Sequence, residues 1–418
     1  MNFEELLKDK PCSCGMTHKC AIKHIIVGKD ANKQLGSLMG EYRHVVLCAD
    51  ENTYAACGQV AEEQIGDRLQ AKLVYHRDGL VIPNEEAVTE LQALLTEETD
   101  LIVGVGSGVI QDICKYVSFG AKLPYYIVAT APSMDGYASV GAAMIMGGMK
   151  VTYSAHVPEV IIGDIDVLKD APMDMIQSGY GDILGKYSCL NDWKLAKVVR
   201  GEYFCQYVYD LTMDMVMKTR DLGPKLLQRD PEAIQTLMEA IVGVGVAMAF
   251  VGNSRPASGS EHHLSHFFEI VGILNDEPYF MHGTDVVYSS VYTERLREQL
   301  LALPAPARRE LPSREQREGA IRKIYTKIAD SVIALQDKVG WYEEDRFPIY
   351  EEKWQEICDV LKEAPSSKEM LGYVESIGLN PAEFYESYGR EKIARALTFG
   401  KDLKDRFSVL WLYYDLLA

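Results

Sequence analysis

Three histidines in one short stretch of the chain have the spacing expected of metal ligands. His262 and His266 are four residues apart, so on a helix they project from the same face. His282 follows after a turn-rich connection at 275–278. Imidazole nitrogens suit a divalent metal that needs three or four converging donors. Paired helical histidines also occur as surface or core residues, so this interpretation depends on the rest of the chain.

A carboxylate that could join the histidines is Asp182, in a glycine-containing stretch at 179–186 that we expect to open a helix. One carboxylate and two imidazoles would leave a coordination position open for substrate, which is typical of a catalytic metal site. The alternative is an acid that only favours the start of a helix through the helix dipole.

A glycine-rich loop, Gly104-Val-Gly106-Ser107-Gly108, follows a predicted strand and leads into a helix that carries Asp112. Glycines let the backbone approach a pyrophosphate closely, and a helix N-terminus offers N–H groups to its charge. The usual dinucleotide fingerprint would have glycine at position 109, where this chain has valine, so the match is partial.

Polar residues follow two other predicted strands. Asp50 could accept hydrogen bonds from an adenosine ribose, and its charge would repel the 2′-phosphate of NADP, which favours NAD. An ordinary turn or helix N-cap residue is the equal alternative for Asp50. Thr130, Ser133 and Asp135 follow the strand at 125–129, at the edge where α/β sheets bind ligands.

A group of hydrogen-bond donors lies just upstream of the histidines. Asn253, Ser254 and Arg255 follow an apolar helix expected at 240–251. Amide, hydroxyl and guanidinium groups together suit a phosphate or another anionic oxygen group. A polar turn between two helices is the alternative interpretation.

The elements that position these residues fall into two kinds. Before Pro172, short apolar runs alternate with helical patterns, which implies a parallel sheet covered on both faces. The predicted elements are buried strands at 44–49, 72–76, 101–105, 125–129 and 160–164, helices at 85–95 and 109–119, and a hairpin at 142–153 with its turn at 147–148. Long helical patterns follow. We therefore predict an α/β nucleotide-binding domain with a mainly parallel sheet over 1–172 and an all-α domain over 173–418.

The composition limits the classes of partner. The chain has 418 residues, of which 47% are hydrophobic and 25% charged, as in an ordinary globular protein. Its net charge of −18 argues against nucleic acid or an anionic membrane as partner, but not against a small anionic substrate. The acidic start of the chain does not resemble a secretory signal, and the scattered cysteines suggest reduced thiols. We expect a cytoplasmic protein without a membrane-spanning segment.

One cysteine cluster raises the question of a second metal. Cys12, Cys14, His18 and Cys20 crowd into nine residues, whereas a structural zinc site normally has a second ligand pair beyond a longer loop. The sequence therefore favours a tight turn with incidental thiols over a zinc site.

Taken in order, these motifs resemble the dehydroquinate synthase-like and metal-dependent alcohol dehydrogenase superfamily, and within it the bacterial sn-glycerol-1-phosphate dehydrogenases. The resemblance covers roughly residues 20 to 290. It rests on the glycine loop with Asp112, the 130–136 stretch, Gly181-Asp182, the 253–262 stretch and His282-Gly283.

The resemblance implies a role for each motif. It implies that Asp182, His262 and His282 bind a divalent zinc, nickel or iron ion in a cleft between the two domains. The spacing to His266 favours His262 over His263 as the ligand. It further implies cofactor phosphates at Gly106, Ser107, Gly108 and Asp112, the nicotinamide near Thr130 and Ser133, substrate at Asp135, and a proton-relay residue at His266.

The implied reaction is reduction of dihydroxyacetone phosphate to sn-glycerol 1-phosphate by NAD(P)H in a homodimeric enzyme. Two other reactions are open: oxidation of glycerol or another unphosphorylated polyol, and a dehydroquinate-synthase-like lyase reaction with transient use of bound NAD. Arg255 argues against the first. The second is disfavoured because those relatives have Gly-His-x-x-Gly-His, where this chain has Ser260-Glu-His262-His-Leu-Ser-His266. A catalytically inactive homologue is a third alternative, which the complete ligand set does not support.

Overall fold

The computed structural model describes residues 1–147 and 149–418. These residues form two compact units, each with its own core. The first unit comprises Met1–Ile183 and Met217–Asn253, and the second comprises Leu184–Val216 and Ser254–Ala418. The chain thus passes from the first unit to the second, returns to the first, and then enters the second again, where it ends. The sequence predicted a single boundary near residue 172.

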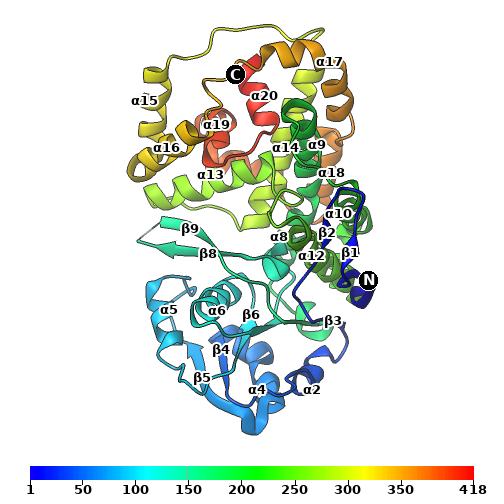
Figure 1. Ribbon diagram of the computed structural model, residues 1–418, viewed down its shortest axis with the longest axis vertical. Coiled ribbons are helices and arrows are strands. Elements are labelled where there is room, and N and C mark those ends of the chain that lie inside the picture. Colours follow the sequence, from blue (N-terminus) through cyan, green and yellow to red (C-terminus); the bar gives the residue numbers. More distant parts are fainter. Residues whose placement is uncertain (148) are drawn as a thin grey trace. The chain divides into compact units, whose positions relative to one another are not determined.

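The first unit is built on a six-stranded parallel sheet (Figure 1). Its strand order is β3-β10-β7-β6-β4-β5, with β3 and β5 at the edges. The strands are β3 (His24–Gly28), β4 (Val45–Asp50), β5 (Leu69–Tyr75), β6 (Leu101–Gly106), β7 (Tyr125–Ala129) and β10 (Val160–Asp164). Five of them agree with predicted strands; the edge strand β3 was not predicted.

The order of the strands marks one position in the sheet as a ligand site. From β6 the chain order runs outward through β7 and β10, whereas β4 is followed outward by β5. The strand order therefore reverses between β4 and β6. Parallel α/β sheets bind ligands at the carboxyl ends of the strands beside such a reversal. Asp50 ends β4 and Gly106 ends β6, so both lie there.

Helices cover both faces of this sheet, as continuous apolar strands require. On one face, Leu35, Ala61 and Ile65 pack against Val103 and Val128 of the central strands. On the other, α6 packs close to β6, because Gly104 leaves room for the Cys114 side chain. The helices before β10 are α1 (Phe3–Leu6), α2 (Leu35–Leu38), α3 (Glu51–Thr53), α4 (Gln59–Ile65), α5 (Glu85–Gln92) and α6 (Gly108–Ala121), with short helical turns η1 (Ala31–Gln34), η2 (Tyr54–Gly58), η3 (Gly66–Arg68) and η4 (Asp135–Ala138).

The first unit also contains the apolar helix α12 (Pro231–Val251). The chain returns to this unit at Met217 because α12 is part of its core. Asp230 caps the helix at Ala233 N, Pro231 stands in its first turn, and Gly252 ends it with a φ of +74°. Gly245 lets the helix approach Ala138 of η4, where a Cβ would lie only 2.7 Å from the alanine Cβ. Helices α7 (Ile165–Leu168), α8 (Met173–Leu184) and α11 (Gly223–Leu227) complete this part.

Helix α12 is long and apolar enough to cross a membrane by length and composition. Most of it is buried inside the protein, 78% of the most apolar window. A buried core helix of a globular unit passes the same test, so the membrane interpretation has little weight here.

Two small antiparallel pairs lie outside the main sheet. The first is β1 (Lys10–Pro11) with β2 (Thr17–His18), which the sequence predicted only as a tight turn. The second is β8 (Gly141–Met146) with β9 (Met149–Ser154), in agreement with the predicted hairpin. The predicted turn of that hairpin includes Gly148, which lies outside the described residues.

The second unit is helical throughout its described elements. It contains α9 (Lys186–Arg200), α13 (Ser260–Asn275), α14 (His282–Leu301), α15 (Arg314–Tyr325), α16 (Ala329–Val339), α17 (Phe347–Leu361), α18 (Ser367–Ser376), α19 (Pro381–Phe399) and α20 (Val409–Leu416), the turns η5 (Thr326–Ile328) and η6 (Gly400–Leu403), and the start of α10 (Gln206–Thr219). Helix α13 packs on α14, η6 and α9, so it lies at the centre of this unit.

Candidate metal and cofactor sites

The three predicted histidines lie together in the second unit. His262 and His266 occupy one face of α13, and His282 is the first residue of α14, which packs against α13. The ring centroids lie 5.0 Å apart for His262 and His282, 5.6 Å for His266 and His282, and 6.0 Å for His262 and His266. A ring nitrogen of His262 lies within 4.8 Å of one of His282. The two imidazoles can therefore serve one ion.

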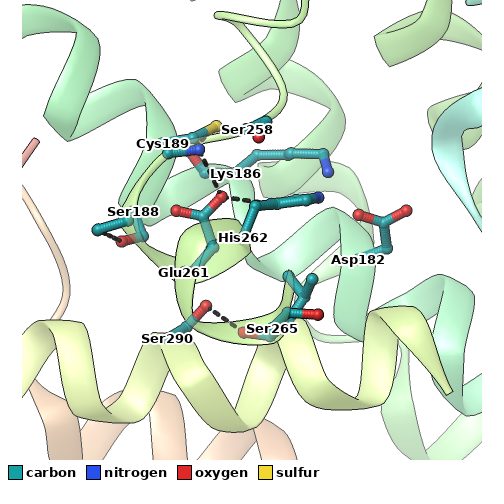
Figure 2. A network of polar contacts seen from close by, with 12 residues as sticks. Asp182, Lys186, Ser188, Cys189, Ser258, Glu261, His262, Ser265 and Ser290 are labelled. Atoms are coloured by element: carbon teal, nitrogen blue, oxygen red, sulfur yellow. Dashed lines mark hydrogen bonds and ion pairs between the residues drawn. The ribbon is translucent and has the colours of Figure 1, made fainter. Parts of the chain in front are cut away.

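Glu261 orients the His262 ring. Its Oε1 accepts the Nδ1–H of His262 at 2.6 Å and the backbone N–H of Gly259 at 2.9 Å (Figure 2). Metal-binding histidines typically donate their second ring nitrogen to such an acceptor, which directs the other nitrogen to the metal. Burial alone would raise the pKa of Glu261, but the hydrogen bond and charge of His262 lower it below its usual value. The carboxylate is thus ionised and leaves Nε2 of His262 for a ligand.

A buried network of charges holds the start of α13 in place. Arg297 donates to Asp192 at 2.9 Å and to Glu294 at 3.1 Å. The other carboxylate oxygen of Asp192 accepts the N–H of Ser260, the first residue of α13, at 2.6 Å. These groups are almost completely buried, and burial raises the pKa of Glu294 to about 8. Asp192 therefore acts as the helix cap that no residue of α13 itself supplies.

Lys186 is a candidate site residue that the sequence analysis missed. Its side chain is fully buried and runs alongside His262 in Figure 2, and its charge contributes to the low pKa of Glu261. A buried ammonium group beside a candidate metal ligand suits a developing negative charge or an anionic substrate group. Its position directly after Gly185, in the stretch that contains Asp182, was the available sequence signal.

The structure also distinguishes the role of His262 from that of the adjacent His263. His263 is completely buried on a different face of α13, and burial lowers its pKa well below the usual value. A buried histidine near the charges of Lys404, Arg406 and Arg255 is better suited to packing than to binding a cation. His262, which lies with His266 and His282, is the one that faces the group.

Asp182 lies in the first unit, near the C-terminal end of α8 rather than at the start of a helix as predicted. The prediction placed it in the first turn because Gly179 and Gly181 resemble a loop. Gly179 is instead a close-packing position, since a Cβ there would collide with the Pro132 carbonyl. The Asp182 carboxylate is buried and accepts the backbone N–H of Asp135 at 2.9 Å. Two predicted site residues are therefore joined directly.

The glycine loop at the end of β6 is a candidate phosphate cradle. Ser107 precedes α6 and its side chain does not cap the helix, so the first N–H groups of α6 face outward for a ligand. Thr130 joins this loop, because its N–H donates to the Gly106 carbonyl at 3.2 Å. At Gly108 an added Cβ would meet nothing closer than Met134 at 3.6 Å, which leaves room for a pyrophosphate. These residues fit a dinucleotide.

Asp112 and Asp50 have structural contacts that the prediction did not include. Asp112 faces the buried Lys115 at 3.5 Å, and Lys115 also donates to the Gly141 carbonyl at 2.7 Å. Burial raises the pKa of Asp112 and lowers that of Lys115. A role of Asp112 at the cofactor phosphates does not fit this pairing.

Asp50 is the N-cap of α3, where it accepts the N–H of Thr53 at 2.8 Å, so the N-cap interpretation describes its observed contact.

Arg255 needs a correction as well. Its guanidinium is buried and binds Glu202 through two hydrogen bonds of 2.8 and 2.7 Å, and it also donates to the Phe407 carbonyl. A planar fork already matched by a carboxylate is not available to a substrate phosphate. Arg255 therefore ties together parts of the second unit. Ser254, its neighbour, accepts a hydrogen bond from Arg406 at 2.8 Å.

Known proteins with similar sequences identify the family. A glycerol-1-phosphate dehydrogenase [NAD(P)+] of Bacillus velezensis is 31% identical over 378 residues, which cover 87% of this chain and 93% of that protein. The enzyme of the same name from Geobacillus thermodenitrificans is 30% identical, over 88% of this chain and 86% of that protein. The chain belongs to the glycerol-1-phosphate dehydrogenase family. It is an NAD(P)-dependent, metal-containing alcohol dehydrogenase, and residues 26–172 match the family model of iron-containing alcohol dehydrogenases.

Solved structures confirm the fold of this family member. An iron-containing alcohol dehydrogenase of Thermococcus thioreducens has a TM-score of 0.61 at 14% identity, over 94% of this chain and 98% of that chain. A glycerol dehydrogenase of Schizosaccharomyces pombe has a TM-score of 0.54 at 18% identity, over 86% and 92%. The predicted combination of a parallel α/β part and a helical part is therefore confirmed.

Proposed function

We propose that this family member reduces dihydroxyacetone phosphate to sn-glycerol 1-phosphate with NAD(P)H. The observation that carries the proposal is the pair of imidazoles, His262 and His282, with Glu261 hydrogen-bonded to His262. The names of the curated relatives supply the substrate class. The phosphate cradle at the start of α6 supports the dinucleotide.

The proposed metal ligands are Asp182, His262 and His282. One carboxylate and two imidazoles are donors suited to one divalent ion. Zinc, nickel and iron all accept such donors. When bound, the metal would act as a Lewis acid and polarise the substrate carbonyl.

The residues around these ligands perform the remaining tasks in the proposal. Glu261 keeps His262 in the tautomer with Nε2 unprotonated. His266, which is partly exposed and near both imidazoles, supplies or relays the proton that the product alcohol needs. Asp135 orients the substrate hydroxyl, and its backbone N–H positions Asp182.

Anion binding in the proposal differs from the sequence prediction. Because Glu202 occupies the guanidinium of Arg255, we assign the positive charge for substrate to Lys186. Asn253 and Ser254 stay as proposed neutral donors to the phosphate, and Thr130 and Ser133 as residues near the nicotinamide. The proposed preference for NAD depends on a contact between Asp50 and the ribose. Asp50→Gly should therefore narrow the difference between the activity with NADH and the activity with NADPH.

The deciding experiment measures NADH oxidation by metal-stripped protein supplied with dihydroxyacetone phosphate, before and after addition of zinc, nickel or iron. We expect activity to return with metal and to be much lower with unphosphorylated dihydroxyacetone. The His282→Ala variant should lack metal-restored activity. His76→Ala is the matched control, because His76 is an exposed histidine directly after β5.

Each other outcome points elsewhere. Equal activity on dihydroxyacetone would favour a polyol dehydrogenase. Product formed from a cyclic sugar-acid phosphate without net NADH oxidation would favour the lyase. A product that an sn-glycerol-3-phosphate-specific dehydrogenase consumes would contradict the proposed enantiomer.

We also propose a cytoplasmic homodimer. The reduced thiols are consistent with a cytoplasmic location. Light scattering on the purified protein would contradict the dimer if it gave the mass of one 46.8 kDa chain.

A further inference from the structure

The N-terminal hairpin gathers three potential metal ligands that the dehydrogenase reaction does not use. Cys12 and Cys14 lie in the turn between β1 and β2, and His18 ends β2. The turn is closed by hydrogen bonds from Cys12 N to Met16 O at 2.9 Å and from Gly15 N to Cys12 O at 3.1 Å. Both sulfurs and one ring nitrogen of His18 lie within 4.8 Å of one another. The spacing Cys-x-Cys-x-x-x-His thus brings three donors to one point.

His18 has the orientation of a metal-bound histidine. It is completely buried, and its Nδ1 lies 3.1 Å from the Phe250 carbonyl. Phe250 is in the last turn of α12, where carbonyls lack partners within the helix. Donation of Nδ1–H to this carbonyl places the lone pair of the neutral ring on Nε2, and Nε2 lies 3.5 Å from the Cys14 sulfur. A backbone carbonyl on the second nitrogen is the usual support of a zinc-bound histidine.

The distance between Cys14 and His18 agrees with a shared ion. Zinc–sulfur bonds of about 2.3 Å and zinc–nitrogen bonds of about 2.0–2.1 Å, at a tetrahedral angle, place the two ligand atoms about 3.5–3.6 Å apart. The observed separation is 3.5 Å. A weak thiol–imidazole hydrogen bond would have a similar length, so experiment must separate the two cases.

We propose that Cys12, Cys14 and His18 are ligands of a structural zinc ion. Thiolates and imidazoles are the ligands that structural zinc sites use. The three donors come from one short hairpin of the first unit and lie close together.

The ion would hold the hairpin on the end of α12. Through His18 it connects the hairpin to the Phe250 carbonyl. The amino group of Met1 forms an ion pair with Glu239 of the same helix, so two contacts attach the start of the chain to α12. Helix α12 in turn packs against η4, which carries Asp135. Zinc would thus stabilise an element next to a proposed substrate residue without taking part in the reaction.

The test measures metal content and the cobalt spectrum of the full-length protein. The purified, dialysed His282→Ala variant, which lacks a ligand of the histidine site, should still retain zinc. Cys12→Ser and Cys14→Ser should each lose about one equivalent of zinc relative to wild type. Cobalt bound by thiolates produces a strong sulfur-to-metal charge-transfer absorption, which carboxylate and imidazole ligands do not. We expect this absorption in wild type and in His282→Ala.

Cys20→Ser is the matched control, because Cys20 is in the same segment but outside the ligand group. This variant should keep both the zinc and the cobalt absorption. Loss of metal in Cys20→Ser equal to that in Cys14→Ser would contradict the assigned ligands.

Wild-type protein alone can overturn the proposal, even if the cysteine variants do not fold. Absence of the thiolate–cobalt absorption after refolding with cobalt would exclude the site. So would rapid reaction of Cys12 and Cys14 with a thiol reagent at a rate that zinc does not change. The outcome is independent of the dehydrogenase assay: zinc retained by an inactive protein would support this site and contradict only the proposed reaction.

Discussion

The cradle in the first unit and the histidine group in the second are built from different parts of the chain. The cradle uses backbone: glycines at the end of β6 and the N–H groups that begin α6. The histidine group uses side chains, and these are held by further side chains, Glu261 on His262 and Asp192 on the start of α13. A backbone site needs space and a helix end, whereas a side-chain site needs a buried network of charges to hold each ring.

The difference has consequences for substitutions. In the cradle, an added methyl group should act by steric overlap. In the histidine group, removal of one charge should leave its partners buried without compensation. Four predictions separate the two cases, from the largest expected effect to the smallest.

Arg297→Met should lower the free energy of unfolding by about 3–5 kcal/mol, because it leaves the carboxylate of Asp192 buried without its cation. Denaturation with urea measures this. The control is Arg308→Met, whose exposed pair with Asp345 should contribute at most about 1 kcal/mol. Equal effects of the two variants would show that burial of the network is unimportant.

Glu261→Gln should weaken metal binding by roughly 10–100-fold, since glutamine keeps the shape and an acceptor oxygen but loses the charge that supports His262. Competition with a chelator measures the affinity. Glu391→Gln on the exposed surface of α19 serves as the control. Unchanged affinity in Glu261→Gln would mean that His262 is oriented by other contacts.

Gly106→Ala and Gly108→Ala should affect different properties. At position 106 a Cβ would lie 2.6 Å from that of Ile110, so overpacking should cost about 1–3 kcal/mol of stability. At position 108 the Cβ has room in the protein but would enter the cradle, so the KM for NADH should rise about tenfold, equivalent to roughly 1.4 kcal/mol of binding. Thermal denaturation and steady-state kinetics measure the pair. If Gly108→Ala instead lowered Tm with KM unchanged, the cofactor would not lie at this helix end.

Glu294→Gln should change how stability depends on pH. Burial raises the pKa of Glu294 from 4.5 to about 8, so the folded protein keeps a proton that the unfolded chain releases. Its contribution to stability is complete below pH 4.5 and is lost as the pH rises through about 8. The Tm of the variant minus that of wild type should therefore be small near pH 5 and increase up to about pH 8. A difference that stays constant over this range would show that Glu294 is already ionised at pH 5.

Much of the fold could be predicted because the local pattern was sufficient. The continuous apolar runs at β4, β6, β7 and β10 predict buried parallel strands, and the glycine loop predicts the helix that follows it. The pairing of His262 with His266 follows from helical periodicity. The role of His263 could not be predicted, because adjacent residues of one helix differ only in what packs against them.

By itself, the sequence determined the parallel sheet, the glycine loop with the helix that follows it, and the placement of His262 and His266 on one helix face, because each depends on residues that are neighbours along the chain. Only the tertiary structure decided which polar groups already have partners. Arg255 binds Glu202, and Asp192 caps α13 from another helix. These contacts join residues 53 and 68 positions apart. A buried charge takes its role from the partner that packing brings to it, and local spacing carries no record of that partner.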